Sequence, residues 1–170
     1  FWESLDQVHV SVHPGSRIST KEVKNWQAIA HIHGVGFELR HTDRFWETCS
    51  ELGTPNQELV NRIYSACQIA HTWRCHAVCE GFFFRCSQSI FIPQVLGHRS
   101  GLSPMVDGLK LETREGFTEA LLHFLMAREP LDSCGHCLGT VGKRFSPVQE
   151  PRRVSVPPRA TEPLIDWDYL

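Results

Sequence analysis

The sequence predicts an α/β protein in which a strand–helix–strand unit precedes a small α+β domain with a β-hairpin. Valines at residues 8–12 alternate with polar residues, which is the two-residue period of a strand. Ser19-Thr20-Lys21-Glu22 has the pattern of a capping box, and apolar residues recur after it at helical spacing. A second strand is predicted at 35–39. Because a helix and short loops join these two strands, we expect them to be parallel neighbours with a right-handed crossover.

Three further elements are predicted in the second half of the chain. Thr54 and Pro55 suit the N-cap and the first position of a helix that ends near Cys67. Residues 76–84 read as a hairpin, because two apolar runs flank a turn that contains glycine. Apolar residues at helical spacing predict another helix over residues 114–128.

These patterns divide the chain into three parts. Residues 1–45 hold the strand–helix–strand unit, and residues 46–143 hold the hairpin and most of the cysteines. Residues 144–170 are rich in proline and short of helical periodicity, so we expect an extended tail.

Composition excludes several classes of function. The chain has 170 residues and a formal net charge of -2, which argues against nucleic-acid binding driven by bulk positive charge. No apolar run is long enough for a membrane-spanning helix. The chain opens Phe1-Trp2-Glu3-Ser4 without the pattern of a secretory signal, so we expect a part of a longer, cytoplasmic protein. In that setting seven cysteines, an odd number, favour reduced thiols or a metal site over disulfides.

Two pairs of cysteines have the spacing of metal ligands. Cys134 and Cys137 are separated by two residues, so both sulfurs can turn onto one metal. Cys67 and Cys86 lie before and after the hairpin, which returns the chain to its own start, and Gly81 permits a positive φ in the turn. The predicted ligands are therefore Cys67, Cys86, Cys134 and Cys137, with Cys75 as a substitute for Cys67.

The pattern Cys67-x13-Gly81-x4-Cys86, followed by Cys134-x2-Cys137, resembles the auxiliary-cluster domain of radical SAM enzymes. That domain is called SPASM, or twitch in its shorter one-cluster form, and the resemblance covers roughly residues 5–143. It implies that the strand–helix–strand unit ends a partial (β/α) barrel that binds S-adenosylmethionine. It further implies an auxiliary [4Fe-4S] cluster for electron transfer or substrate handling. Four cysteine ligands favour electron transfer, because no iron is left open.

The chain departs from this family at one point. The motif Cys-x3-Cys-x2-Cys, which holds the cluster that cleaves S-adenosylmethionine, begins at Cys75-x3-Cys79 but meets Phe82 at its third position. The resemblance therefore implies that this second [4Fe-4S] cluster belongs to a missing N-terminal barrel of the same protein. We expect this chain alone to be inactive on S-adenosylmethionine. The resemblance implies a small molecule or a peptide as the substrate.

Ser11 and Arg40 are candidate cofactor-binding residues. Both fall toward the C-terminal ends of the predicted parallel strands, where such folds bind their ligands. In the family that the chain resembles, polar residues at these positions line the cavity for S-adenosylmethionine and substrate.

Two alternatives follow from the same cysteines. Zinc also accepts four thiolates, so a zinc-stabilised binding module without chemistry fits the ligand set. Cys134-Gly-His-Cys137 also matches the active-site tetrapeptide of thiol–disulfide oxidoreductases, in which a helix N-terminus activates the first thiol. Gly139 and Gly142 make the following segment a poor helix start, which weighs against that second alternative.

Overall fold

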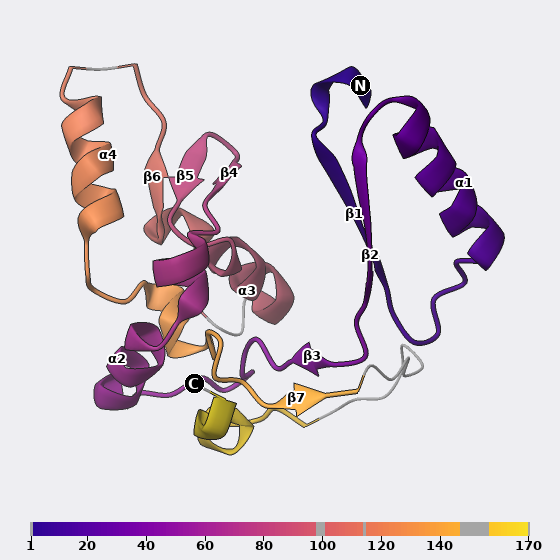
Figure 1. The fold of residues 1–170 in the computed structure, drawn as a ribbon. Coiled ribbons are helices and arrows are strands. Elements are labelled where there is room, and N and C mark those ends of the chain that lie inside the picture. Colours follow the sequence, from indigo (N-terminus) through magenta and orange to yellow (C-terminus); the bar gives the residue numbers. More distant parts are fainter. Residues whose placement is uncertain (1, 98–100, 114, 147–156, 170) are drawn as a thin grey trace. The chain divides into compact units, whose positions relative to one another are not determined.

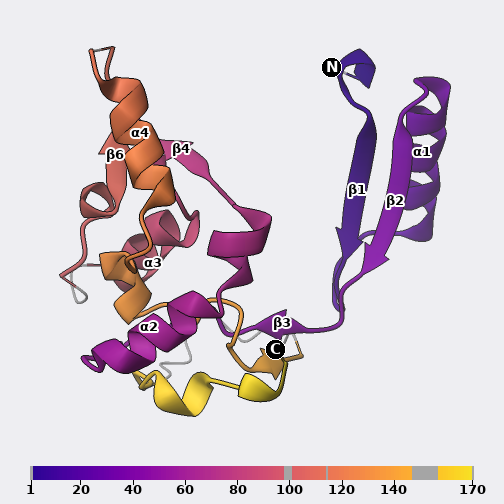
Figure 2. The same ribbon diagram turned by 60° about the vertical axis from the view of Figure 1, so that its left-hand side comes forward.

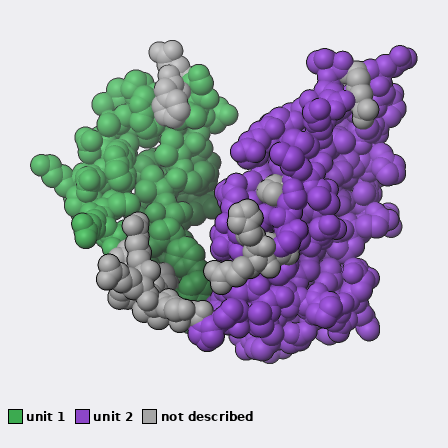
Figure 3. Space-filling model, turned by 180° about the vertical axis from the view of Figure 1, so that it is seen from behind, with its two compact units in different colours: residues 1–45, 144–154 green, residues 46–143, 155–170 purple. Residues whose placement is uncertain are grey.

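The chain folds into two compact units of mixed α and β structure, which Figure 3 colours separately. The first unit comprises residues 1–45 and 144–154, and the second comprises residues 46–143 and 155–170. None of the described helices is long and apolar enough to cross a membrane. The computed structural model describes residues 2–97, 101–113, 115–146 and 157–169.

The first unit contains the predicted strand–helix–strand arrangement (Figure 1). Strand β1 (Gln7–Val12) is followed by helix α1 (Thr20–Ile32) and strand β2 (Gly36–His41). The two strands are parallel, with Ser11 opposite Arg40 in the register. The predicted parallel pairing is therefore confirmed.

Helix α1 begins and ends where its sequence indicates. The Glu22 carboxylate accepts the Ser19 backbone N–H at 2.8 Å, and the Ser19 hydroxyl accepts the Glu22 N–H at 3.2 Å, which completes the predicted capping box. Gly34 has φ +68° directly after the helix, a conformation that glycine adopts without a steric penalty. The helix runs along the two strands in both ribbon views and buries Ala30 (Figures 1 and 2).

The second unit contains the predicted hairpin and a third strand. Strands β4 (Ala77–Cys79) and β5 (Phe82–Phe84) pair antiparallel. Glu80 and Gly81 between them have φ values of 49° and 78°, as in a two-residue hairpin turn. Strand β6 (Gly108–Lys110) pairs with the other edge of β5, a partner that the sequence did not reveal.

Helix α2 (Gln57–Ser65) starts two residues later than predicted. Its N-cap is Asn56, whose side chain accepts the Leu59 N–H at 3.1 Å. The Thr54 hydroxyl instead accepts the N–H of Asn56 at 3.2 Å, so Thr54 contacts the N-cap residue and is not the N-cap itself. Asparagine is at least as favourable an N-cap residue as threonine, which is consistent with a helix that begins after Asn56. Cys67 follows the end of the helix, as expected.

Two more helices pack in the second unit. Helix α3 (Gln88–Leu96) was not predicted, because its sequence is apolar on all sides and Pro93 lies inside it. Helix α4 (Phe117–Met126) lies within the predicted span of 114–128 but is shorter, and residue 114 lies outside the described residues.

The C-terminal segment differs from the expected extended tail. Residues 157–169 pack as part of the second unit, whereas 147–156 lie outside the described residues. Arg159 forms an ion pair with Glu47. The hydroxyls of Ser50 and Thr161, both fully buried, form a hydrogen bond of 2.7 Å. These polar contacts join positions far apart in the chain, so they cannot be predicted from local sequence patterns.

Short elements complete the described chain. Strands β3 and β7 form a two-stranded sheet, and the others are single turns of helix. Their bounds are β3 (Phe45–Trp46), β7 (Arg144–Phe145), the π-helical turn Ile69–Trp73, and the 3-10 turns Trp2–Ser4, Pro104–Val106, Asp132–Gly135, Glu162–Leu164 and Trp167–Tyr169.

Candidate metal centre

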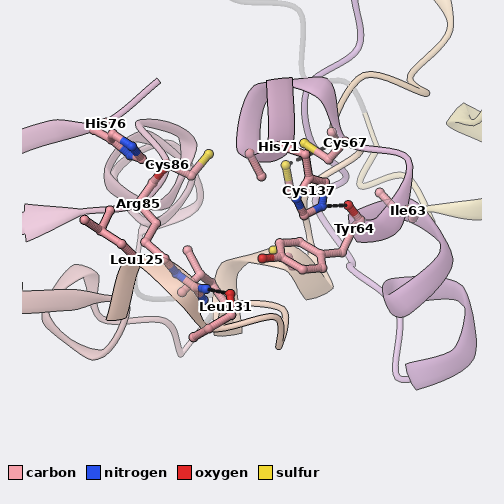
Figure 4. A pocket seen from close by; sticks show the side chains of 14 residues that line it. Ile63, Tyr64, Cys67, His71, His76, Arg85, Cys86, Leu125, Leu131 and Cys137 are labelled. Carbon is pink, nitrogen blue, oxygen red and sulfur yellow. Dashed lines mark hydrogen bonds between the residues drawn. The ribbon is translucent and has the colours of Figure 1, made fainter. Parts of the chain in front are cut away.

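A cavity of about 80 Å³ in the second unit is lined by all four cysteines predicted as ligands (Figure 4). Cys67 and Cys86 flank the hairpin, whereas Cys134 and Cys137 lie in the segment after α4. Two distant stretches of the chain therefore contribute to the cavity wall. Cys75, the predicted substitute, does not line the cavity. We call this site the four-cysteine cavity, formed with Cys67, Cys86, Cys134 and Cys137.

Helix α2 and the hairpin position the first pair. Cys67 follows α2, donates its N–H to the Tyr64 carbonyl at 3.0 Å, and is 6% exposed. Cys86 follows strand β5, where its carbonyl accepts the Ser89 hydroxyl at 2.6 Å at the start of α3. The hairpin between them returns the chain to the cavity, as the spacing predicted.

A buried carboxylate fixes the loop that carries the second pair. Cys134 lies in the 3-10 turn Asp132–Gly135. Asp107 is 3% exposed and accepts the N–H groups of Asp132 at 2.7 Å and Ser133 at 2.9 Å. Asp107 could not be predicted from the sequence, because an isolated aspartate far from the cysteines carries no signal of this role.

Gly139 lies against both cysteine pairs. Its N–H donates to the Cys137 sulfur at 3.3 Å. It has φ +52°, and a Cβ at this position would lie 3.2 Å from the Cys67 sulfur. A glycine therefore lets the loop approach both sulfurs. Hydrogen bonds from backbone N–H groups to cysteine sulfur are also among the interactions that tune metal–thiolate centres.

Burial raises the pKa of every thiol in the cavity. It raises the pKa of Cys134 to about 12, with further increases from Asp107, Cys86 and Cys67. Burial also raises the pKa of Cys137 well above its usual range, and Cys134, Cys86 and Cys67 add to that increase. Burial raises the pKa values of Cys67 and Cys86 as well. Without a cation the thiols are therefore protonated at neutral pH, and a bound metal must displace their protons.

The metal-free protein should lose stability as the pH rises above about 9. The ordinary pKa of a cysteine is 9.0, and that of Cys134 in the folded chain is about 12. The unfolded chain therefore releases its proton first, so the stabilisation is complete below about pH 9 and is lost as the pH rises toward 12. Urea unfolding with a chelator and a reductant, at about pH 8 and about pH 10.5, measures the loss. Cys134→Ser should show a smaller loss, and equal losses would contradict the expectation.

Several polar side chains in the cavity wall were not predicted. His71 donates from Nε2 to the Tyr64 carbonyl at 2.8 Å, and His76 donates from Nδ1 to the Arg85 carbonyl at 3.0 Å. These two are hydrogen-bonded to the backbone and also line the cavity.

The remaining cysteines lie outside the cavity, and all seven cysteines of the chain are free thiols. Cys75 is near enough to contribute to the raised pKa values of Cys67 and Cys86. Cys49 forms an isolated β-bridge with Cys137. Over the part of the chain that the structure describes, no three Cys, His, Asp or Glu side chains are grouped so that they could hold one metal ion.

Ser11 and Arg40 lie opposite each other near the C-terminal ends of β1 and β2. Both are exposed, and Arg40 forms an ion pair with Glu38 at 2.7 Å. Glu38 also contacts His9 at 2.8 Å, so this polar row follows one face of the two strands. The two candidates are thus brought together, on the first unit.

The geometry around Cys134 does not suit a thiol–disulfide oxidoreductase. Such an enzyme needs a thiol with a lowered pKa at the start of a helix. Here the pKa of Cys134 is raised by burial, and a 3-10 turn replaces the helix.

Comparison of the chain with protein-family models and with curated proteins finds no match.

Proposed function

We propose that this chain binds an auxiliary [4Fe-4S] cluster through Cys67, Cys86, Cys134 and Cys137, as the C-terminal region of a radical SAM enzyme. The observation that carries the proposal is that these four cysteines, from two distant stretches, line one cavity. The donor set fits the group, because Fe–S clusters are held by cysteine thiolates. When bound, the cluster supplies a site that accepts and releases single electrons.

The cavity has room for a cluster. Its volume of about 80 Å³ is several times the roughly 10–15 Å³ that one water molecule requires. A zinc ion would draw four sulfurs to about 2.3 Å from one centre, so the two centres require different arrangements of the thiols. The chain's own contribution is to bury Cys67 and Cys137 and to direct the Gly139 N–H at the Cys137 sulfur.

The first unit supports the wider context of the proposal. Its two parallel strands and the helix between them have the order expected at the end of a (β/α) barrel. Ser11 and Arg40, at the carboxyl ends of those strands, would then face S-adenosylmethionine or substrate. The cluster that cleaves S-adenosylmethionine would come from an N-terminal barrel of the same protein. We propose a cytoplasmic location, because a reducing compartment keeps cysteines available as metal ligands.

Anaerobic reconstitution of the chain with iron, sulfide and a reductant tests the proposal. We expect a brown protein with about four irons and four sulfides per chain. Reduction with dithionite should produce a paramagnetic species. A colourless protein that takes up zinc tightly and refuses iron would contradict the cluster and favour the zinc-stabilised module.

A second assay tests the division of labour. The reconstituted chain is incubated with S-adenosylmethionine and dithionite, and 5′-deoxyadenosine is measured. None is expected above a control without protein, because Phe82 interrupts the only start of the motif at Cys75-x3-Cys79. Clear production of 5′-deoxyadenosine would contradict the role of an auxiliary centre.

A further inference from the structure

Arg85 brings a positive charge to the four-cysteine cavity. It lies between strand β5 and Cys86, and its side chain lines the cavity (Figure 4). Its guanidinium is 5.2 Å from the centre of the Phe124 ring. A charged group is unusual in a wall otherwise formed largely by apolar side chains and thiols.

The contacts of Arg85 leave part of its guanidinium without a partner. One terminal nitrogen donates to the Ala127 carbonyl, and the other donates to the Glu129 carbonyl at 3.0 Å. These carbonyls follow the C-terminal end of helix α4, where a cation is favourable. The Nε atom is buried and has no hydrogen-bond partner.

Within the part of the chain that the structure describes, Arg85 takes part in none of the ion pairs between side chains. Arg85 is half-buried, so its positive charge is partly removed from water. An anionic partner in the cavity would stabilise that charge.

The positive charge of Arg85 affects Tyr64, another residue of the cavity wall. Burial raises the pKa of the Tyr64 hydroxyl, Arg85 acts against that rise, and Cys134, Cys67 and Glu129 add to it. One phenol in the cavity wall is thus within electrostatic range of the guanidinium and of two thiols. In Figure 4, the Arg85 side chain and the Tyr64 ring lie on facing sides of the cavity.

We propose that Arg85 supplies the positive charge that balances an anionic metal–thiolate centre in the four-cysteine cavity and raises the reduction potential of that centre. The inference rests on the proposed function. A metal centre with four thiolates carries net negative charge, and reduction by one electron adds to it. A fixed cation nearby therefore favours both the formation of the centre and its reduced state.

Redox titration of the reconstituted chain tests this role. Arg85→Gln should bind the cluster but favour its reduced state tenfold less, which is a fall of about 59 mV in midpoint potential. Arg85→Lys keeps the charge and should change the potential by less than half of that amount. Arg62→Gln is the matched control, because Arg62 stacks 4.0 Å above the Trp167 ring and does not line the cavity. It should leave the potential unchanged.

A second measurement uses zinc alone and needs no cluster. Arg85→Gln should bind Zn²⁺ about tenfold more weakly than the unaltered chain, whereas Arg85→Lys should stay within about twofold. If Arg85→Gln does not fold, Arg85→Lys decides, since a tenfold loss in a variant that retains the charge would overturn the assignment. An unaltered potential and an unaltered zinc affinity in Arg85→Gln would overturn it too. Failure of the unaltered chain to take up iron, with normal zinc binding, would count against the proposed cluster alone.

Discussion

Serine in place of Cys134 should abolish iron binding by this chain. A serine hydroxyl is a poor ligand for iron in a cluster, and the loop that carries Cys134 and Cys137 offers no third sulfur. We expect bound iron to fall from about four atoms to less than about one per chain after anaerobic reconstitution. Iron and sulfide analysis together with visible absorption measures the loss.

Cys79→Ser is the matched control for this experiment. Cys79 lies at the end of strand β4 and does not line the four-cysteine cavity, so the variant should bind iron like the unaltered chain. Cys67→Ser and Cys75→Ser then decide between the two candidates for the fourth ligand. Loss of iron in Cys75→Ser with retention in Cys67→Ser would show that the ligand assignment is mistaken.

Alanine in place of Asp107 should destabilise the second unit by about 3 kcal/mol. The variant leaves the N–H groups of Asp132 and Ser133 buried without an acceptor, and each such loss costs about 1–3 kcal/mol. Burial raises the pKa of Asp107, so part of the loss is offset by relief of a desolvated charge. Urea unfolding of the metal-free chain under reducing conditions measures the change.

Two variants delimit this effect. Asp107→Asn keeps one carbonyl oxygen at the site and should cost about half as much. Asp166→Ala removes a carboxylate that accepts one N–H near the surface, from Asp168, and should cost less than about 1 kcal/mol. If Asp107→Ala unfolds at the same urea concentration as Asp166→Ala, the buried carboxylate does not hold the loop.

Local patterns sufficed where neighbouring residues determine the structure. The capping box at Ser19 and Glu22 acts within one turn, and the hairpin is set by the turn at Glu80 and Gly81. The four cysteines predicted as ligands line one cavity, and the hairpin accounts for part of this because it lies between Cys67 and Cys86. That all four bind one metal centre stays a prediction.

The rest depends on contacts between distant positions. Strand β6 adds to the hairpin after an intervening helix, and Asp107 caps a turn that begins 25 residues later. Arg85 looks like an ordinary surface arginine in the sequence, because the carbonyls that it binds follow a helix that comes much later. Periodicity and turn chemistry carry no information about such partners.

The packing of the C-terminal segment has a consequence for synthesis on the ribosome. Ser50 donates its N–H to the His136 carbonyl at 2.9 Å, and its hydroxyl pairs with Thr161. The hydrogen bonds that link the Cys134–Cys137 loop to Ser50 and Thr161 are therefore complete only after residues near 161 have been translated. At about 5–20 residues per second, Cys67 precedes Thr161 by roughly 5 to 20 s. During that interval the nascent thiols are open to oxidation, so delivery of iron and sulfide to this chain is expected to follow translation.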